Sequence, residues 1–114
     1  MKSSKLDPIL KVSVFVIDEY DRLLVFEHPN FPNAGVQVPA GTIKQDEQPK
    51  KAAFRELTEE TGILAFKINR FITRKLLNEV RRGHEESHDR WFFQATPTEK
   101  MPEEWMFGDS TDSG

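Results

Sequence analysis

Cysteine is absent from the 114-residue sequence, which excludes disulfide bonds and thiolate metal sites. An excess of basic residues is also absent, because the formal net charge is -3, and this argues against a long nucleic-acid groove. There is no apolar run long enough for a membrane span, and residues 1–10 lack the apolar stretch of a signal peptide. These absences predict a cytoplasmic protein without a membrane segment.

The residues that are present support one folded domain. Hydrophobic residues make up 37% of the chain and charged residues 31%, a mixture typical of globular proteins rather than disordered ones. The length suits a single compact domain and not two. We predict a flexible N-terminus over residues 1–8, a domain over residues 9–107 and a flexible tail over residues 108–114.

Alternation and turn residues predict a mixed sheet. Residues 10–17 are rich in β-branched side chains, with Val12, Val14 and Val16 on one face and Phe15 and Ile17 on the other. Both faces of this strand therefore look covered. The other predicted strands are residues 22–26, 36–38, 66–77 and 90–96, and the main predicted loops are residues 28–35, 41–48 and 78–89.

One segment carries a strong helix signal, the thirteen-residue stretch from Pro49 to Thr61. Pro49 suits the first helical position, and Gly62 suits the residue just past the end. Ala53, Phe54 and Leu57 form an apolar stripe between these signals.

The same helix carries acidic residues where a helix chosen for stability would not. Glu56, Glu59 and Glu60 share one face by their i, i+3, i+4 spacing, and like charges there repel. Glu59 and Glu60 also lie in the last turn, where the helix dipole disfavours negative charge. A cluster of carboxylates is a usual site for hard cations such as Mg²⁺ beside substrate phosphates. A glutamate-rich face is more often only a solvated surface, so the neighbouring sequence has to decide between a metal site and a solvated surface.

The surroundings resemble the Nudix box. That box is a glycine, five residues, a glutamate, seven residues, then Arg-Glu-aliphatic-any-Glu-Glu-any-Gly-aliphatic, and every fixed position is filled here at the right spacing. The matching residues are Gly41, Glu47, Arg55, Glu56, Leu57, Glu59, Glu60, Gly62 and Ile63.

The resemblance implies a role for each matching residue. Glu56, Glu59 and Glu60 correspond to metal-binding carboxylates of the family, and Gly41 corresponds to a glycine whose carbonyl often joins the metal shell. Two further residues, Glu47 and Arg55, correspond to a charged pair that braces the loop against the helix. Gly62 is better explained as a helix stop, and Leu57 and Ile63 as core.

The implied activity is hydrolysis of a pyrophosphate linkage in a nucleoside diphosphate joined to another group. Mg²⁺ or Mn²⁺ would neutralise the phosphates and acidify a bound water, and a glutamate would take the proton. Glu59 or Glu60 could be that base within the box. Glu85, Glu86, Glu103 and Glu104 are alternatives from later segments that we expect to be loops.

Several other residues have less specific signals. His84 and His88 lie in the predicted charged loop, where a solvated histidine is a more common finding than a phosphate ligand. Phe31 and Trp105 are candidates to stack on a base, although packing explains them equally well. Residues 91–93 (Trp-Phe-Phe) suit the core of the sheet better than a base platform.

The fold implied by the resemblance is an α/β/α sandwich around a mixed sheet. Only one helix is evident in the sequence, so we expect either that the natural chain continues past Gly114 with a further strand and helix, or that a homodimer covers the second face. Competing functions are a catalytically silent nucleotide-binding module, which the intact box disfavours, and an acidic interaction domain, which leaves the spacing unexplained. Motifs that would name the nucleotide substrate are missing outside the box.

Overall fold

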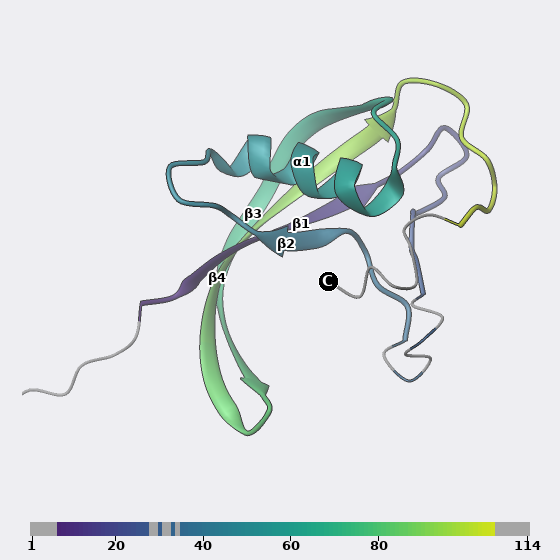
Figure 1. Ribbon diagram of the computed structural model, residues 1–114. Coiled ribbons are helices and arrows are strands. Elements are labelled where there is room, and N and C mark those ends of the chain that lie inside the picture. Colours follow the sequence, from purple (N-terminus) through teal and green to yellow (C-terminus); the bar gives the residue numbers. More distant parts are fainter. Residues whose placement is uncertain (1–6, 28–29, 31–32, 34, 107–114) are drawn as a thin grey trace, which may run out of the picture.

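The computed structural model describes residues 7–27, 30, 33 and 35–106, and Figure 1 shows their arrangement. Most of the predicted flexible N-terminus, the aromatic residue Phe31 and the predicted tail from Gly108 lie outside the described residues.

A mixed four-stranded sheet carries one helix. The elements in chain order are β1 (Ile9–Val16), β2 (Ala40–Thr42), α1 (Pro49–Thr61), β3 (Phe66–Arg81) and β4 (His84–Pro97). The strand order in the sheet is β2-β1-β4-β3. The central pair β1 and β4 is parallel, and the two outer pairs are antiparallel. The prediction of a mixed sheet with one clear helix is confirmed.

Helix α1 begins and ends at the residues that the sequence predicts. Pro49 lies at its start, and Gly62 adopts the left-handed conformation (φ 74°) that lets its N–H donate to the carbonyl of Thr58. Leu57 is fully buried, with Ala52 and Ala53 on the same side of the helix. This side packs on the sheet, and Figure 1 shows α1 lying across the sheet in the half away from the β3–β4 turn.

The two faces of the sheet differ. The face under α1 is apolar and buried, because Val14 and Val16 of β1 lie beside Phe93 and Ala95 of β4. On the opposite face Phe15 stacks on Phe92 with ring centroids 5.9 Å apart. The other β4 residues on this opposite face are polar, namely Arg90, Gln94 and Thr96.

The run of three aromatic residues at 91–93 suggests a strand that is apolar on both faces, and the structure shows that residues 90–96 are not. A pleated strand sends alternate residues to opposite faces, and this alternation sends the buried pair Phe93 and Ala95 to the α1 side. On the other face only Phe92 is apolar along that part of β4. That face is amphipathic and not a bare apolar patch.

The predicted loop over residues 78–89 is also wrong. β3 continues to Arg81 and β4 restarts at His84, so Arg82 and Gly83 form the turn between them. Both turn residues have positive φ, 52° and 80°, which is the backbone of a tight hairpin turn. Charged side chains fit this strand pair because the hairpin extends beyond the body (Figure 1), and near its turn His84 and Glu85 are exposed.

Two shorter predictions need correction as well. Residues 22–26 and 36–38 form only isolated bridges, Ile17 with Leu23 and Phe26 with Gln37, and not strands. The predicted loop from Gly41 begins as strand β2, because β1 offers it a free edge to pair with.

Candidate metal and catalytic site

The strand β2 and the helix α1 meet at Gly41. A Cβ atom added to Gly41 would collide with the carboxyl group of Glu56, which lies directly against this backbone. Only glycine therefore lets the carboxylate approach so closely. The approach places a backbone segment of the box and a helix carboxylate side by side.

The guanidinium group of Arg55 is the centre of this junction. Its Nε and Nη2 donate to the carboxylate of Glu47 at 2.8 and 2.9 Å, which is a bidentate pair. Its Nη1 donates to Glu56 at 2.7 Å and to Glu59 at 2.9 Å. Nη2 also donates to the backbone carbonyl of Thr42 at 3.0 Å. The Arg55 side chain thus links β2, the following loop and α1.

Glu47 is held in its charged form by this arrangement. Hydrogen bonds from the Arg55 side chain lower the pKa of Glu47 to about 2, and the backbone N–H of Lys44 acts in the same direction. The N–H of Lys44 donates to Glu47 at 2.9 Å, so the carboxylate also closes the loop on itself. Asp46 has a positive φ of 63° in this loop, a conformation that aspartate tolerates better than most residues.

Glu60 has a different environment. Its carboxylate accepts a hydrogen bond from the backbone N–H of Ala40 at 3.0 Å. Burial is the main cause that raises the pKa of Glu60 to about 7; the hydrogen bond from Ala40 acts against it, and the nearby charges of Glu56 and Glu59 act with it. The site therefore holds a carboxyl group whose charge has no cationic partner among the described residues.

The donor set fits a hard divalent cation. Three carboxylates and the backbone of Gly41 supply oxygen ligands of the kind that Mg²⁺ and Mn²⁺ take. Within residues 7–27, 30, 33 and 35–106, no three acidic or histidine side chains already surround a point that a metal could occupy. Arg55 instead holds Glu56 and Glu59, so a cation would have to take these carboxylates from Arg55.

The later acidic candidates do not join this cluster. Glu85 and Glu86 lie in β4 near the hairpin turn, and Glu86 contacts the ring of His88. Glu103 pairs with Arg22 at 3.2 Å, and Glu104 is exposed.

His88 is a correction of the sequence interpretation. It is fully buried (0% exposed) and not a solvated loop histidine. Its Nδ1 lies 2.6 Å from Glu79 of β3, and its Nε2 lies 2.9 Å from Glu86 of β4. The ring thus links the two strands of the hairpin.

The aromatic residues have packing roles. Trp105 is half-buried, and its indole N–H donates to the carbonyl of Thr61 at 3.0 Å, at the end of α1. The guanidinium group of Arg74 lies over the ring of Trp91, with the Arg74 Cζ atom 4.1 Å from the ring centroid. The prediction that residues 91–93 belong to the sheet is confirmed by the placement of β4.

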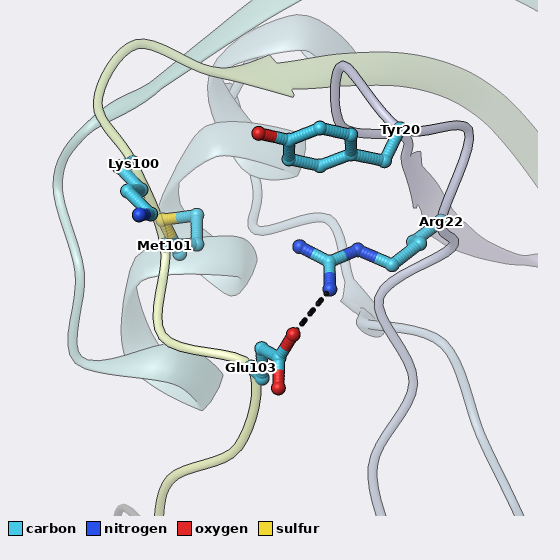
Figure 2. A pocket seen from close by; sticks show the side chains of 5 residues that line it. All are labelled: Tyr20, Arg22, Lys100, Met101 and Glu103. Carbon is cyan, nitrogen blue, oxygen red and sulfur yellow. Dashed lines mark hydrogen bonds and ion pairs between the residues drawn. The ribbon is translucent and has the colours of Figure 1, made fainter.

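A cavity that the sequence did not indicate lies between two distant segments. Tyr20 and Arg22 form one side, and Lys100, Met101 and Glu103 form the other (Figure 2). Its volume is about 280 Å³, and the Arg22–Glu103 ion pair crosses it. No carboxylate of α1 lines it, so it is separate from the site at Gly41.

At the junction of β2 and α1, Glu56 lies against Gly41 and Glu60 accepts a hydrogen bond from Ala40, so residues of the motif found in the sequence meet there. The sequence model of the NUDIX domain family matches residues 7–111, and the chain belongs to this family. The prediction from the box is therefore confirmed at the level of family.

Individual relatives agree with this assignment. Nudix hydrolase 25 of Arabidopsis thaliana is 42% identical over 57 residues, which are 50% of this chain and 32% of that protein. The chain thus matches about a third of that relative's length.

Solved structures show the same fold. A NUDIX-family hydrolase from Clostridium perfringens superimposes with a TM-score of 0.64 at 23% identity, covering 82% of this chain and 71% of the other. The E. coli dihydroneopterin triphosphate pyrophosphohydrolase gives a TM-score of 0.63 at 15% identity, covering 82% and 70%. The α/β Nudix fold expected from the sequence is confirmed.

Helix α1, the helix of the described residues, is too short and too polar to cross a bilayer.

Proposed function

We propose that this protein is a divalent-metal-dependent hydrolase that cleaves a pyrophosphate linkage in a nucleoside diphosphate joined to another group. The observation that carries the proposal is the junction at Gly41, where the Glu56 carboxylate lies against the backbone and Glu60 bonds to the N–H of Ala40. Together with the intact box, this junction suits a cation that prefers oxygen ligands, next to a phosphate chain.

The metal ligands in this proposal are Glu56, Glu59, Glu60 and the backbone of Gly41. Mg²⁺ or Mn²⁺ bound there would neutralise the phosphate charge and lower the pKa of a coordinated water. The side chain of Glu59 is 54% exposed, so it can turn from Arg55 without opening the core. Glu60 is partly buried, and its carboxylate has to release only the hydrogen bond from Ala40 to reach a metal ion.

Arg55 and Glu47 have a positioning role. Arg55 keeps Glu56 and Glu59 on the same side of α1 despite their mutual repulsion, and Glu47 fixes Arg55 through two hydrogen bonds. Either Glu59 or Glu60 serves as the proton acceptor for the attacking water. Glu60 is the better placed of the two, because burial removes competing solvent from its carboxylate.

The substrate in this proposal is a small phosphorylated nucleotide or a related compound. The E. coli structure with the same fold is named for a triphosphate of dihydroneopterin, which supports phosphoanhydride cleavage and leaves the leaving group open. A cytoplasmic location and a homodimer complete the proposed state. A catalytically silent nucleotide-binding module is the alternative function, and it predicts binding without turnover.

A substrate screen tests the proposal. Nucleoside diphosphate derivatives are incubated with the protein and with Mg²⁺ or Mn²⁺, and phosphate or nucleotide products are measured. We expect turnover that needs the metal, and a loss of at least about tenfold in Glu60→Gln. The matched control is Glu27→Gln, an exposed glutamate outside the site. Equal turnover in Glu60→Gln and in the control, or turnover in metal-free buffer, would overturn the site.

A further inference from the structure

Strand β3 is a long unpaired edge of the sheet. It spans 16 residues and pairs with β4 on one side, and no strand of the described residues pairs with its other side. Its outer half belongs to the hairpin that projects from the body in Figure 1. An exposed edge of this length offers backbone N–H and C=O groups to another strand, and proteins normally protect such edges.

The outer half of β3 also exposes apolar side chains. Leu76 is 65% exposed and Val80 is 71% exposed, although both belong to a strand. Leu77, between them, is half-buried on the face that also holds His88. Two strands that project without further cover are marginally stable by themselves, so this hairpin would gain from a partner along its edge.

The charges on β3 restrict which partner fits. Lys75 lies beside Arg90 of β4 and has no acidic partner among the described residues. Glu79 is the acidic residue of this strand and lies four positions further along; it contacts His88 within the hairpin, and 36% of its side chain remains exposed to a partner. A second copy of β3 running antiparallel can place these two opposite each other, because its direction is reversed.

We propose that β3 pairs antiparallel with β3 of a second copy, with Leu77 on the two-fold axis. In this register Lys75 lies opposite the partner's Glu79, and Glu79 opposite the partner's Lys75. Thr73 then faces the partner's Arg81, so no like charges lie directly opposite over residues 73–81. Cross-strand pairs of opposite charge stabilise antiparallel sheets.

Neighbouring symmetric registers fit less well. Centring the pair on Lys75 would place two lysines opposite each other, and centring it on Asn78 would place Lys75 opposite Arg81. Centring it on Leu76 avoids like charges but leaves Lys75 opposite Leu77. Only the Leu77 register gives Lys75 an acidic neighbour. The result is one continuous sheet through both copies, with both α1 helices on the same side.

Cysteine cross-linking tests this register, because the native sequence contains no cysteine. Residues directly opposite in an antiparallel pair have Cα atoms about 4.5–5.5 Å apart, within the range of a disulfide. In Leu77→Cys the two thiols would lose two protons and two electrons to added diamide and form one disulfide. The control is Val80→Cys, whose two copies would lie roughly 20 Å apart along the strands.

We expect Leu77→Cys to form covalent dimers at micromolar protein at least about tenfold faster than Val80→Cys, although Val80 is the more exposed residue. Equal rates would show random collision, and no dimer from Leu77→Cys would show that β3 has no such partner. Either result overturns the proposal. Cross-linking is measured independently of turnover, so failure of this dimer contact leaves the proposed hydrolase activity untouched.

A charge reversal separates a second copy from an acidic extended peptide as the partner. In the Leu77→Cys background, Lys75→Glu should slow cross-linking at least about tenfold, because Glu79 would then face a like charge. Lys67→Glu on the same strand lies outside the paired segment and should leave the rate unchanged. If Lys75→Glu and Lys67→Glu slow cross-linking equally, the effect does not depend on the register. The positive charge of β3 would then attract any acidic chain, which contradicts the proposal.

Discussion

The junction between β2 and α1 and the outer β3–β4 hairpin use ion pairs in opposite ways. At the junction, Arg55 is 21% exposed and contacts three carboxylates and a backbone carbonyl. In the hairpin, Arg74 is 54% exposed and makes one bidentate pair with Asp89, over the ring of Trp91. The same chemical pair is therefore part of a shared network in one region and a single surface contact in the other.

This difference shows that the junction is the more constrained of the two regions. Removing one partner from a half-buried network leaves several groups without hydrogen bonds, whereas an exposed pair exchanges its partner for water at little cost. The junction also holds acidic groups against their mutual repulsion, which is a feature of functional sites and not of stable helices. The hairpin has no comparable conflict apart from its exposed edge.

Matched arginine substitutions give the largest expected contrast. Arg55→Lys removes the planar fork that serves Glu47 and Glu56 together, and we expect it to lower the free energy of unfolding by about 2–3 kcal/mol. Arg74→Lys should cost about 1 kcal/mol or less. Urea unfolding of both variants measures this. Equal losses would mean that the two regions do not differ as described.

Gly41→Ala should separate metal binding from folding. The added Cβ meets the end of the flexible Glu56 side chain, which can rotate away, so we expect little change in stability. The displaced carboxylate should weaken Mn²⁺ binding by at least about tenfold. Calorimetric titration and thermal unfolding of the same sample give both quantities. Unchanged metal affinity would argue against Gly41 as part of the site.

Acid should weaken the junction through Glu47. Its pKa is about 2 in the folded protein against a usual 4.5, so its contribution to stability is present above pH 4.5 and is lost as pH falls toward 2. We expect Glu47→Gln to flatten the dependence of stability on pH in this window. It should also weaken divalent-cation binding while every ligand remains. An unchanged pH profile in the variant would contradict the bracing role.

The smallest effect concerns the hairpin pair. The Arg74 guanidinium lowers the pKa of Asp89, in the same direction as at Glu47. Because Arg74 is largely exposed, we expect Asp89→Asn to change stability near neutral pH only slightly. Thermal unfolding at neutral pH in low and high salt is the measurement. A loss as large as that of Arg55→Lys would remove the contrast between the regions.

Sequence reasoning succeeded where local signals agree and failed where tertiary pairing decides. Pro49 and Gly62 fix α1 at both ends, and the box spacing predicted which charged residues meet at the junction. The prediction of a loop over residues 78–89 is wrong, because a high content of charged residues does not exclude strands. Strand pairing with a neighbour, and a turn at Arg82 and Gly83, override that local preference.

The buried environment of His88 could not have been predicted from composition. It depends on the β3–β4 register, which places His88 opposite Leu77 and brings Glu79 and Glu86 to its two ring nitrogens. The Tyr20–Met101 cavity depends in the same way on contacts between segments far apart in the chain. Long-range contacts of this kind have no signature in a single sequence.

Divalent-cation affinity tests the central claim most directly. Mn²⁺ is titrated by calorimetry into the unmodified protein, into Glu56→Gln at the junction, and into Glu85→Gln on the exposed hairpin. We predict that Glu56→Gln binds Mn²⁺ at least about tenfold more weakly and that Glu85→Gln binds it as the unmodified protein does. Equal affinity in all three proteins would contradict the assignment of the metal site to α1 and Gly41.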